Sequence, residues 1–203
     1  MRRAGLPARW PQALGAVLLA VVLLPALRRA VESSMTAHML LQYALLMLAG
    51  GLLAARVPAR WRAPLARWNA LGIAGLLGAA IVLAFAMVPR LLDLALVDAR
   101  VEAAKLSALL LAGAALRLSW RPAGIVVQAF FLGNVLPMTG VAGMLYQDAP
   151  LRLCNAYRLD DQQSLGLGLV GLAVGVCAAW LAALACGVGG AAAGAALGDG
   201  VSA

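Results

Sequence analysis

Residues 164–188 read SLGLGLVGLAVGVCAAWLAALACGV, and no charged side chain interrupts them. A helix needs about 20 apolar residues to cross the hydrocarbon core of a bilayer, so this stretch predicts a transmembrane helix. The whole chain shares this composition: of its 203 residues, 64% are hydrophobic and 12% are charged, and the mean hydropathy is +0.93. Soluble globular proteins carry about 25% charged residues. The composition therefore excludes a water-soluble enzyme and a disordered chain, and it predicts an integral membrane protein.

Five further stretches are long and apolar enough to be spans: 11–27, 34–55, 69–89, 102–120 and 123–146. The stretch 102–120 is the weakest, because Glu102 and Lys105 open it. We therefore predict an all-α fold, a polytopic bundle of six transmembrane helices that forms a single integral membrane domain over residues 1–203.

The first stretch has a second interpretation, because Arg2 and Arg3 precede it as in a signal peptide. Arg28 and Arg29 follow it directly, and no A-x-A cleavage site comes before them. We interpret the stretch as a retained helix, and cleavage stays the alternative.

Orientation depends mainly on the loop 56–68, which holds four arginines and no acidic residue. Trp61 and Trp68 in this loop suit a membrane interface. Because cytoplasmic loops are enriched in Arg and Lys, we place this loop in the cytoplasm together with both chain termini. The location expected is a bacterial inner membrane. The net charge of +8 is then explained by loop arginines that set orientation, and nucleic acid is not an expected partner.

Small residues follow one another at helical spacing on two predicted spans, which favours close packing of helix backbones. We expect these faces to pack against other helices of the same chain, and a homo-oligomer is not supported. The positions are Gly171, Gly175, Ala179 and Ala183 on the last span, and Ala70, Ala74 and Gly78 on the third.

His38, the single histidine of the chain, begins the second span near the outer surface. On an α-helix, Met35 and Met39 share a face with it, and Gln42 follows one turn below. An imidazole with thioethers is a soft ligand set that suits Cu(I). Two simpler interpretations stay open: methionine fills gaps in helix cores, and His38 hydrogen-bonds a neighbouring helix.

The loop Asp148–Gln163 is expected to pack over the outer end of the second span. Asp160 and Asp161 would then accept the ring N–H of His38 and orient it, as carboxylates do behind ligand histidines. Capping of the helix that follows is the alternative role for both carboxylates.

Other polar positions have structural explanations. Gln128 and Asn134 are expected to form hydrogen bonds between helices, Pro137 to kink its span, and 90–105 to contain a short interfacial helix. The chain has no zinc motif, no phosphate-binding glycine loop, no nucleophile–base pair, and one histidine where a haem usually needs two axial ligands. We therefore expect no enzymatic activity.

Four short motifs carry a resemblance to a known family. The stretch ESSMTAHMLLQYALLM at 32–47 resembles a helix that reads H-M-x-x-H and then L-L-x-M. MVPRLLD at 87–93 is similar to H-x-P-x-x-Y-D, and 101–120 is similar to V-H-x-x-E-H…A-G…W. The tyrosine at 157 and DQQSLG at 161–166 resemble a tyrosine followed by D-Q-Q-x-x-G. In this order they resemble the caa-type cytochrome c oxidase assembly factors, the CtaG-like membrane proteins.

This resemblance implies a role in oxidase biogenesis, with a respiratory oxidase subunit as partner. The family's other histidines fall on Gln42, Met87, Glu102 and Leu106. The resemblance then implies an outer-side site of His38, Met35, Met39 and Met87 that passes Cu(I) to an oxidase subunit, or a metal-free scaffold that holds this subunit.

Two other functions remain open from the sequence. The chain could be an accessory subunit of a respiratory membrane complex, or a transporter of small solutes or lipids that uses Gln42, Gln128 and Asn134. An accessory subunit stays with the mature complex on purification, whereas an assembly factor leaves it.

Overall fold

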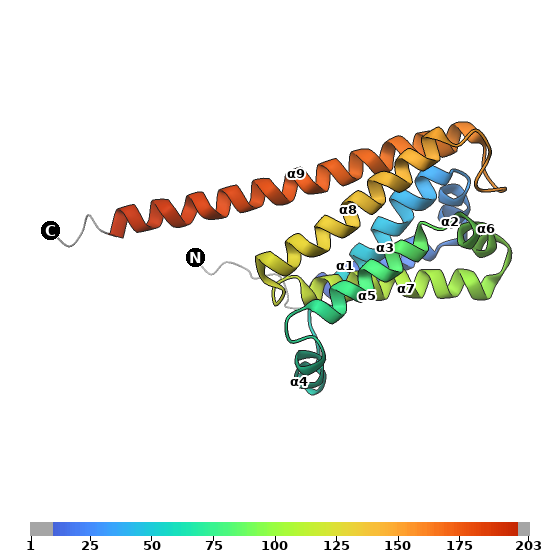
Figure 1. The fold of residues 1–203 in the computed structure, drawn as a ribbon. Helices are drawn as coiled ribbons and strands as arrows, with labels where there is room; N and C mark the ends of the chain where they lie inside the picture. Colours follow the sequence, from blue (N-terminus) through green and yellow to red (C-terminus); the bar gives the residue numbers. More distant parts are fainter. Residues whose placement is uncertain (1–9, 199–203) are drawn as a thin grey trace, which may run out of the picture.

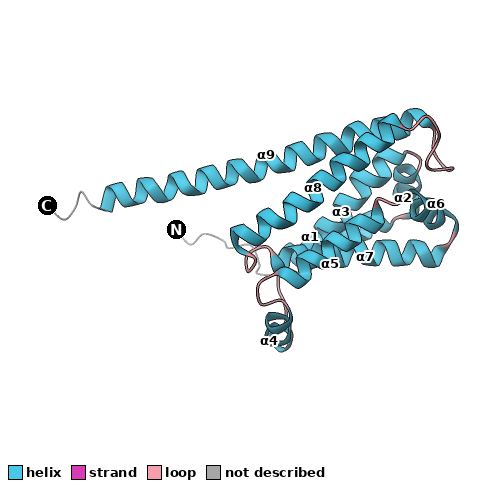
Figure 2. Ribbon diagram, in the orientation of Figure 1, coloured by secondary structure: helices cyan, strands magenta, loops and turns pink. Residues whose placement is uncertain are grey.

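The computed structural model describes residues 10–198, which form helices and connecting loops without a strand (Figure 2). The expected all-α fold is confirmed. The elements are α1 (Trp10–Leu23), α2 (Pro25–Glu32), the π-helix η1 (Ala37–Gln42), α3 (Tyr43–Leu53), α4 (Ala59–Trp68), α5 (Ile73–Ala86), α6 (Pro89–Val97), α7 (Ala99–Ser119), α8 (Gly124–Asp148) and α9 (Leu159–Gly198).

The long helices α1, α3, α5, α7, α8 and α9 run roughly along one axis, and successive ones alternate in direction (Figure 1). The main neighbours are α8 with α9, α3 with α7, α1 with α3, and α5 with α7. α9 is the longest, and its last turns extend past the rest of the bundle (Figure 1). α4 lies at the same end, below the bundle (Figure 1), and it forms a helix where a loop with interfacial tryptophans was expected.

Two prolines divide predicted spans. Pro25 begins α2 and Pro89 begins α6, each at the first helical position, where the missing N–H costs nothing. A proline ring clashes with the carbonyl four residues earlier, which favours a break of the preceding helix at these two positions. The chain bends by 68° between α1 and α2 and by 77° between α5 and α6. The short helix expected within 90–105 is α6.

Two described helices, α8 and the stretch Leu159–Cys186 of α9, are long and apolar enough to cross a membrane. The number rises to four if each bent pair counts as one span, and η1 with α3 forms a shorter apolar helix. These helices suggest a membrane protein. Their length and composition support two to four crossings and not the six that were predicted.

Helix contacts are closest where α3 meets α7. A β-carbon added to Gly50 would lie 1.9 Å from the carbonyl oxygen of Leu110, and one added to Gly113 would lie 1.9 Å from that of Met47. Only glycine fits at both positions, because any side chain would overlap the backbone of the other helix. This contact holds η1, which continues into α3, next to the start of α7.

Candidate functional site

His38 lies on η1, which is wound as a π-helix. Its side chain is completely buried, and that of Gln42 at the other end of the turn is 1% exposed. π-helical turns are rare and often occur at functional sites, because the wider turn redirects the side chains it carries. This local geometry points both polar side chains into the bundle.

Both ring nitrogens of His38 are hydrogen-bonded. Nδ1 lies 2.7 Å from the hydroxyl of Tyr157, and Nε2 lies 2.6 Å from Nζ of Lys105. The Tyr157 hydroxyl donates its proton to the backbone oxygen of Glu32, at 3.0 Å. It must therefore accept at its other side, so Nδ1 carries the ring proton and Nε2 accepts from Lys105.

Burial raises the pKa of the Tyr157 phenol well above its usual range, and the nearby Glu32 carboxylate adds to the shift. The phenol therefore stays protonated at neutral pH and remains available as a donor. This fixes the direction of the hydrogen bonds from His38 to Tyr157 and on to Glu32.

Lys105 connects His38 to a buried carboxylate. Its ammonium lies 2.7 Å from Oε2 of Glu102 and 3.5 Å from Oε1 of Gln42. The side chain of Glu102 is 4% exposed and that of Lys105 is 10% exposed. Neither oxygen of Glu102 accepts a hydrogen bond of normal geometry. The buried negative charge is therefore stabilised mainly by the positive charge of Lys105.

Arg28 and Glu32 complete the group of charges. Arg28 donates to Glu32 at 2.9 Å and lies 3.9 Å from Glu102. Gln42 also donates to Glu32, at 3.4 Å. We call the set of seven side chains the polar cluster; it contains two cations and two carboxylates and is neutral overall. Its members are Arg28, Glu32, His38, Gln42, Glu102, Lys105 and Tyr157.

The loop between α8 and α9 covers the polar cluster, as the sequence predicted. Backbone N–H groups of Asn155 and Ala156 donate to Asp93 on α6, at 2.9 and 3.4 Å. Burial raises the pKa of the Cys154 thiol to about 12, and this neutral thiol contacts the backbone oxygen of Pro89 at 3.7 Å. The loop is thereby tied to α6.

The two carboxylates expected at the His38 ring lie elsewhere. Asp161 accepts from the hydroxyl of Ser34, at 2.8 Å, and from the backbone N–H of Met35. Asp160 is exposed and pairs with Arg158 at 3.4 Å. The expected contact of either carboxylate with the ring is wrong, because Tyr157 reaches Nδ1 first and Asp161 serves the backbone that leads into η1.

The predicted thioether ligands are close to one another in the core. Met35 and Met39 belong to one buried hydrophobic cluster, and Met87 packs against it. Both nitrogens of His38 are occupied, however, and an ammonium stands at Nε2. Among residues 10–198, no three His, Cys, Asp or Glu side chains form a group able to hold a metal ion. This arrangement does not fit Cu(I), and copper binding stays a prediction that requires Lys105 to move.

Sequence reasoning missed most of the polar cluster. Glu102 and Lys105 were noted as charges that weaken a predicted span, and Glu102 also as the position of a family histidine, but their pairing was not predicted, although residues three apart share a helix face. A buried ionisable residue in a membrane segment is by default a functional candidate, and this signal was available for both. Tyr157 had no such signal, because its partner His38 lies 119 positions away.

The four motifs quoted from the sequence converge on this end of the bundle. η1 supplies His38, α6 supplies Asp93, α7 supplies Glu102 and Lys105, and the loop with the start of α9 supplies Tyr157 and Gln162. Gln162 is 1% exposed, accepts from the N–H of Leu153 at 2.8 Å and donates to Tyr146 at 3.1 Å. Each motif therefore contributes a polar contact at this end of the bundle.

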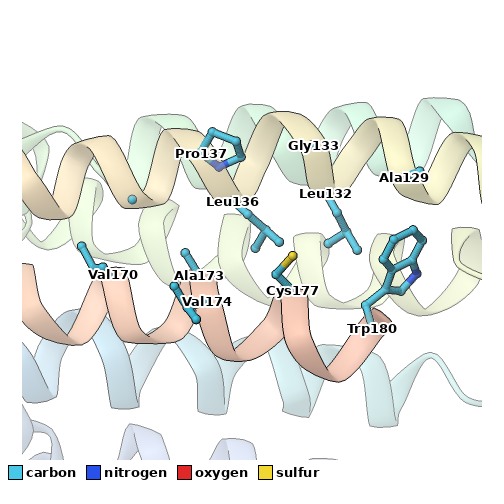
Figure 3. A pocket seen from close by; sticks show the side chains of 11 residues that line it. Ala129, Leu132, Gly133, Leu136, Pro137, Val170, Ala173, Val174, Cys177 and Trp180 are labelled. Atoms are coloured by element: carbon cyan, nitrogen blue, oxygen red, sulfur yellow. The ribbon is translucent and has the colours of Figure 1, made fainter. Parts of the chain in front are cut away.

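Apart from the polar cluster, a concave surface lies between α8 and α9, in the apolar part of the bundle. It is a groove of about 410 Å³, and Leu132, Leu136, Cys177 and Trp180 point into it (Figure 3). The indole of Trp180 donates to Gln128 at 3.3 Å, which confirms the interhelical bond expected for Gln128. Asn134 donates instead to the oxygen of Phe130 on its own helix, so its expected interhelical bond is not formed.

No known protein family, no curated protein and no solved structure matches this chain.

Proposed function

We propose that this chain is a non-enzymatic assembly factor for a cytochrome c oxidase in a bacterial inner membrane. The observation that carries the proposal is that three of the four motifs supply members of one buried polar cluster, while the fourth, through Asp93, anchors the loop that covers it. Residues between positions 32 and 166 come close to one another only in the folded bundle. A scaffold needs such a cluster to hold a defined surface, here the loop between α8 and α9, in one conformation.

The proposed topology has six crossings with both termini in the cytoplasm. Its support is the alternating direction of the six long helices, together with the exposed Arg60 and Arg67 of α4 at the end opposite the polar cluster. Reporter fusions after Arg62 and after Asp148 should report opposite sides of the membrane. Two periplasmic reports would overturn this topology.

The assembly role is tested by deleting the gene in its host and measuring the haem spectrum and activity of the oxidase in isolated membranes. We expect loss of assembled oxidase, restored by the wild-type chain and less well by Lys105→Met, which disrupts the polar cluster. A chain with Arg100→Ala is the matched control, because that arginine lies at the same end, at the exposed start of α7, and belongs neither to the polar cluster nor to the loop. Unchanged oxidase in the deletion strain contradicts the proposal.

An accessory subunit of the same complex remains the second candidate, and co-purification separates the two. A tagged chain should recover oxidase subunits only while the enzyme is being assembled, whereas an accessory subunit would recover the mature enzyme. The transporter hypothesis finds no support in contacts, because Gln42 bonds to Lys105 and Glu32, Gln128 to Trp180, and Asn134 to its own helix.

A further inference from the structure

Three lone pairs from buried side chains converge on one point, and that point holds the ammonium of Lys105. They belong to Nε2 of His38 at 2.6 Å, Oε2 of Glu102 at 2.7 Å and Oε1 of Gln42 at 3.5 Å. Imidazole nitrogen and carboxylate or amide oxygen are also the atoms that bind divalent metal ions. We infer that Lys105 is a tethered cation that fills a latent metal site, so the polar cluster keeps a positive charge without any metal.

The hydrogen bonding of His38 supports this inference independently. A histidine that binds a metal through one nitrogen donates its other N–H to a fixed acceptor, which sets the tautomer and the ring orientation. Here Nδ1–H donates to Tyr157, whose hydroxyl is anchored on the backbone oxygen of Glu32. The ring is therefore held with its free lone pair directed at the cation, as in a metal ligand.

The charge balance shows why a cation must be present. Glu102 is buried and its oxygens lack normal hydrogen bonds, and Arg28 comes no closer than 3.9 Å. Without Lys105 the carboxylate would remain in the bundle with no close counter-ion, which is strongly unfavourable. A carboxylate, an imidazole and an amide oxygen would then attract a hard or borderline ion such as Zn(II) more than the soft Cu(I).

Distances explain why the wild-type chain does not need a metal. Zinc binds nitrogen and oxygen ligands at about 2.0–2.2 Å, well inside the separations found around Nζ. The ammonium instead lies at hydrogen-bonding distance from Nε2 of His38, at 2.6 Å, and at ion-pair distance from Oε2 of Glu102, at 2.7 Å, so it fills the site without a metal. The inference concerns this geometry alone and does not depend on which partner the chain assembles.

The decisive experiment is a Zn(II) titration of the purified full-length chain without a histidine tag. We expect no stoichiometric binding by the wild type. The variant Lys105→Ala should bind one Zn(II) at least about 100-fold more tightly, and its thermal stability should rise with added Zn(II) by mass action. The double variant Lys105→Ala/Glu102→Gln, which removes both charges, should lose both effects. A folded Lys105→Ala that binds no Zn(II), or a wild type that binds as tightly, overturns the inference.

A measurement on the wild type covers the case in which Lys105→Ala does not fold. Lys105 is the only lysine of the chain, so labelling lysine with ¹⁵N at Nζ gives a single side-chain signal. An ammonium held by three acceptors should appear as a slowly exchanging signal at neutral pH, and His38→Ala should accelerate its exchange. A signal that exchanges as fast as that of a free lysine would show that the ammonium does not occupy the site.

Discussion

The α3–α7 contact and the α8–α9 groove are both rich in glycine, yet they use it in opposite ways. At Gly50 and Gly113 an added β-carbon would overlap the backbone of the facing helix. At Gly133 and Gly140, which line the groove, an added β-carbon would meet nothing within 4 Å. The first contact holds the polar cluster in place, whereas the groove is loosely filled. The presence of glycine at helical spacing therefore does not reveal whether a helix face is covered.

This comparison corrects the packing expected from the sequence. Gly171, Gly175 and Gly78 were predicted to pack against other helices of the chain, and the space beside all three is open. Gly113, which was not singled out, makes one of the tightest contacts. The reason is that coverage depends on which face a helix turns toward its neighbours: Gly171 and Gly175 are exposed, whereas Ala173 between them is buried.

The largest loss of stability is expected from substituting Lys105, whose charge is buried where α3 and η1 meet α7. Lys105→Met keeps most of the apolar stem but leaves Glu102 buried without its partner, and loss of one partner of a buried pair costs roughly 3–5 kcal/mol. The free energy of unfolding in lipid–detergent bicelles measures this. The double variant Lys105→Met/Glu102→Leu should recover most of the loss, and equal instability of both variants would contradict the pairing.

Next in size is the substitution Gly113→Ala. The added β-carbon would lie 1.9 Å from the carbonyl oxygen of Met47, so α3 and α7 must move apart to accommodate it. Such overpacking costs typically about 1–3 kcal/mol. The same unfolding measurement applies. If this variant is as stable as the wild type, the backbone contact is looser than described and the contrast with the groove fails.

A smaller loss is expected for Tyr157→Phe, which removes one hydroxyl and leaves the Nδ1–H of His38 without an acceptor. A buried unsatisfied donor costs about 1–3 kcal/mol, and the phenyl ring keeps the packing. Besides stability, the proton NMR signal of the His38 ring N–H should broaden through faster exchange with water. An unchanged signal would mean that Tyr157 does not hold the ring.

The smallest effect belongs to the groove. Gly140→Ala adds a methyl group that meets no atom within 4 Å, and alanine is the better helix former by up to about 1 kcal/mol. We expect unchanged or slightly higher stability, measured beside Gly113→Ala in the same bicelles. A loss comparable to that of Gly113→Ala would show that the groove is filled by another helix, such as one from a second copy.

The sequence predicted the helical fold and the covering loop because both depend on local composition and on chain direction. Pro25 and Pro89 were visible as helix breakers, although the spans 11–27 and 69–89 were predicted to continue through or up to them. The polar cluster was predicted only at His38 and Gln42. Its contacts between elements join distant positions, 67 residues apart for His38 with Lys105 and 119 for His38 with Tyr157, and spacing rules describe only neighbours along a helix.

Glu102 and Lys105 are three residues apart on α7, so their ion pair is available within a single helix. In the proposed topology, α7 leaves the ribosome and enters the lipid before α8 and α9 exist, while the covering loop has not yet been synthesised. Each charge alone would oppose insertion by about 2.5–3.5 kcal/mol at mid-bilayer. Paired on one helix face, the two charges enter as a neutral unit, so the translocon receives a segment already matched to its lipid environment.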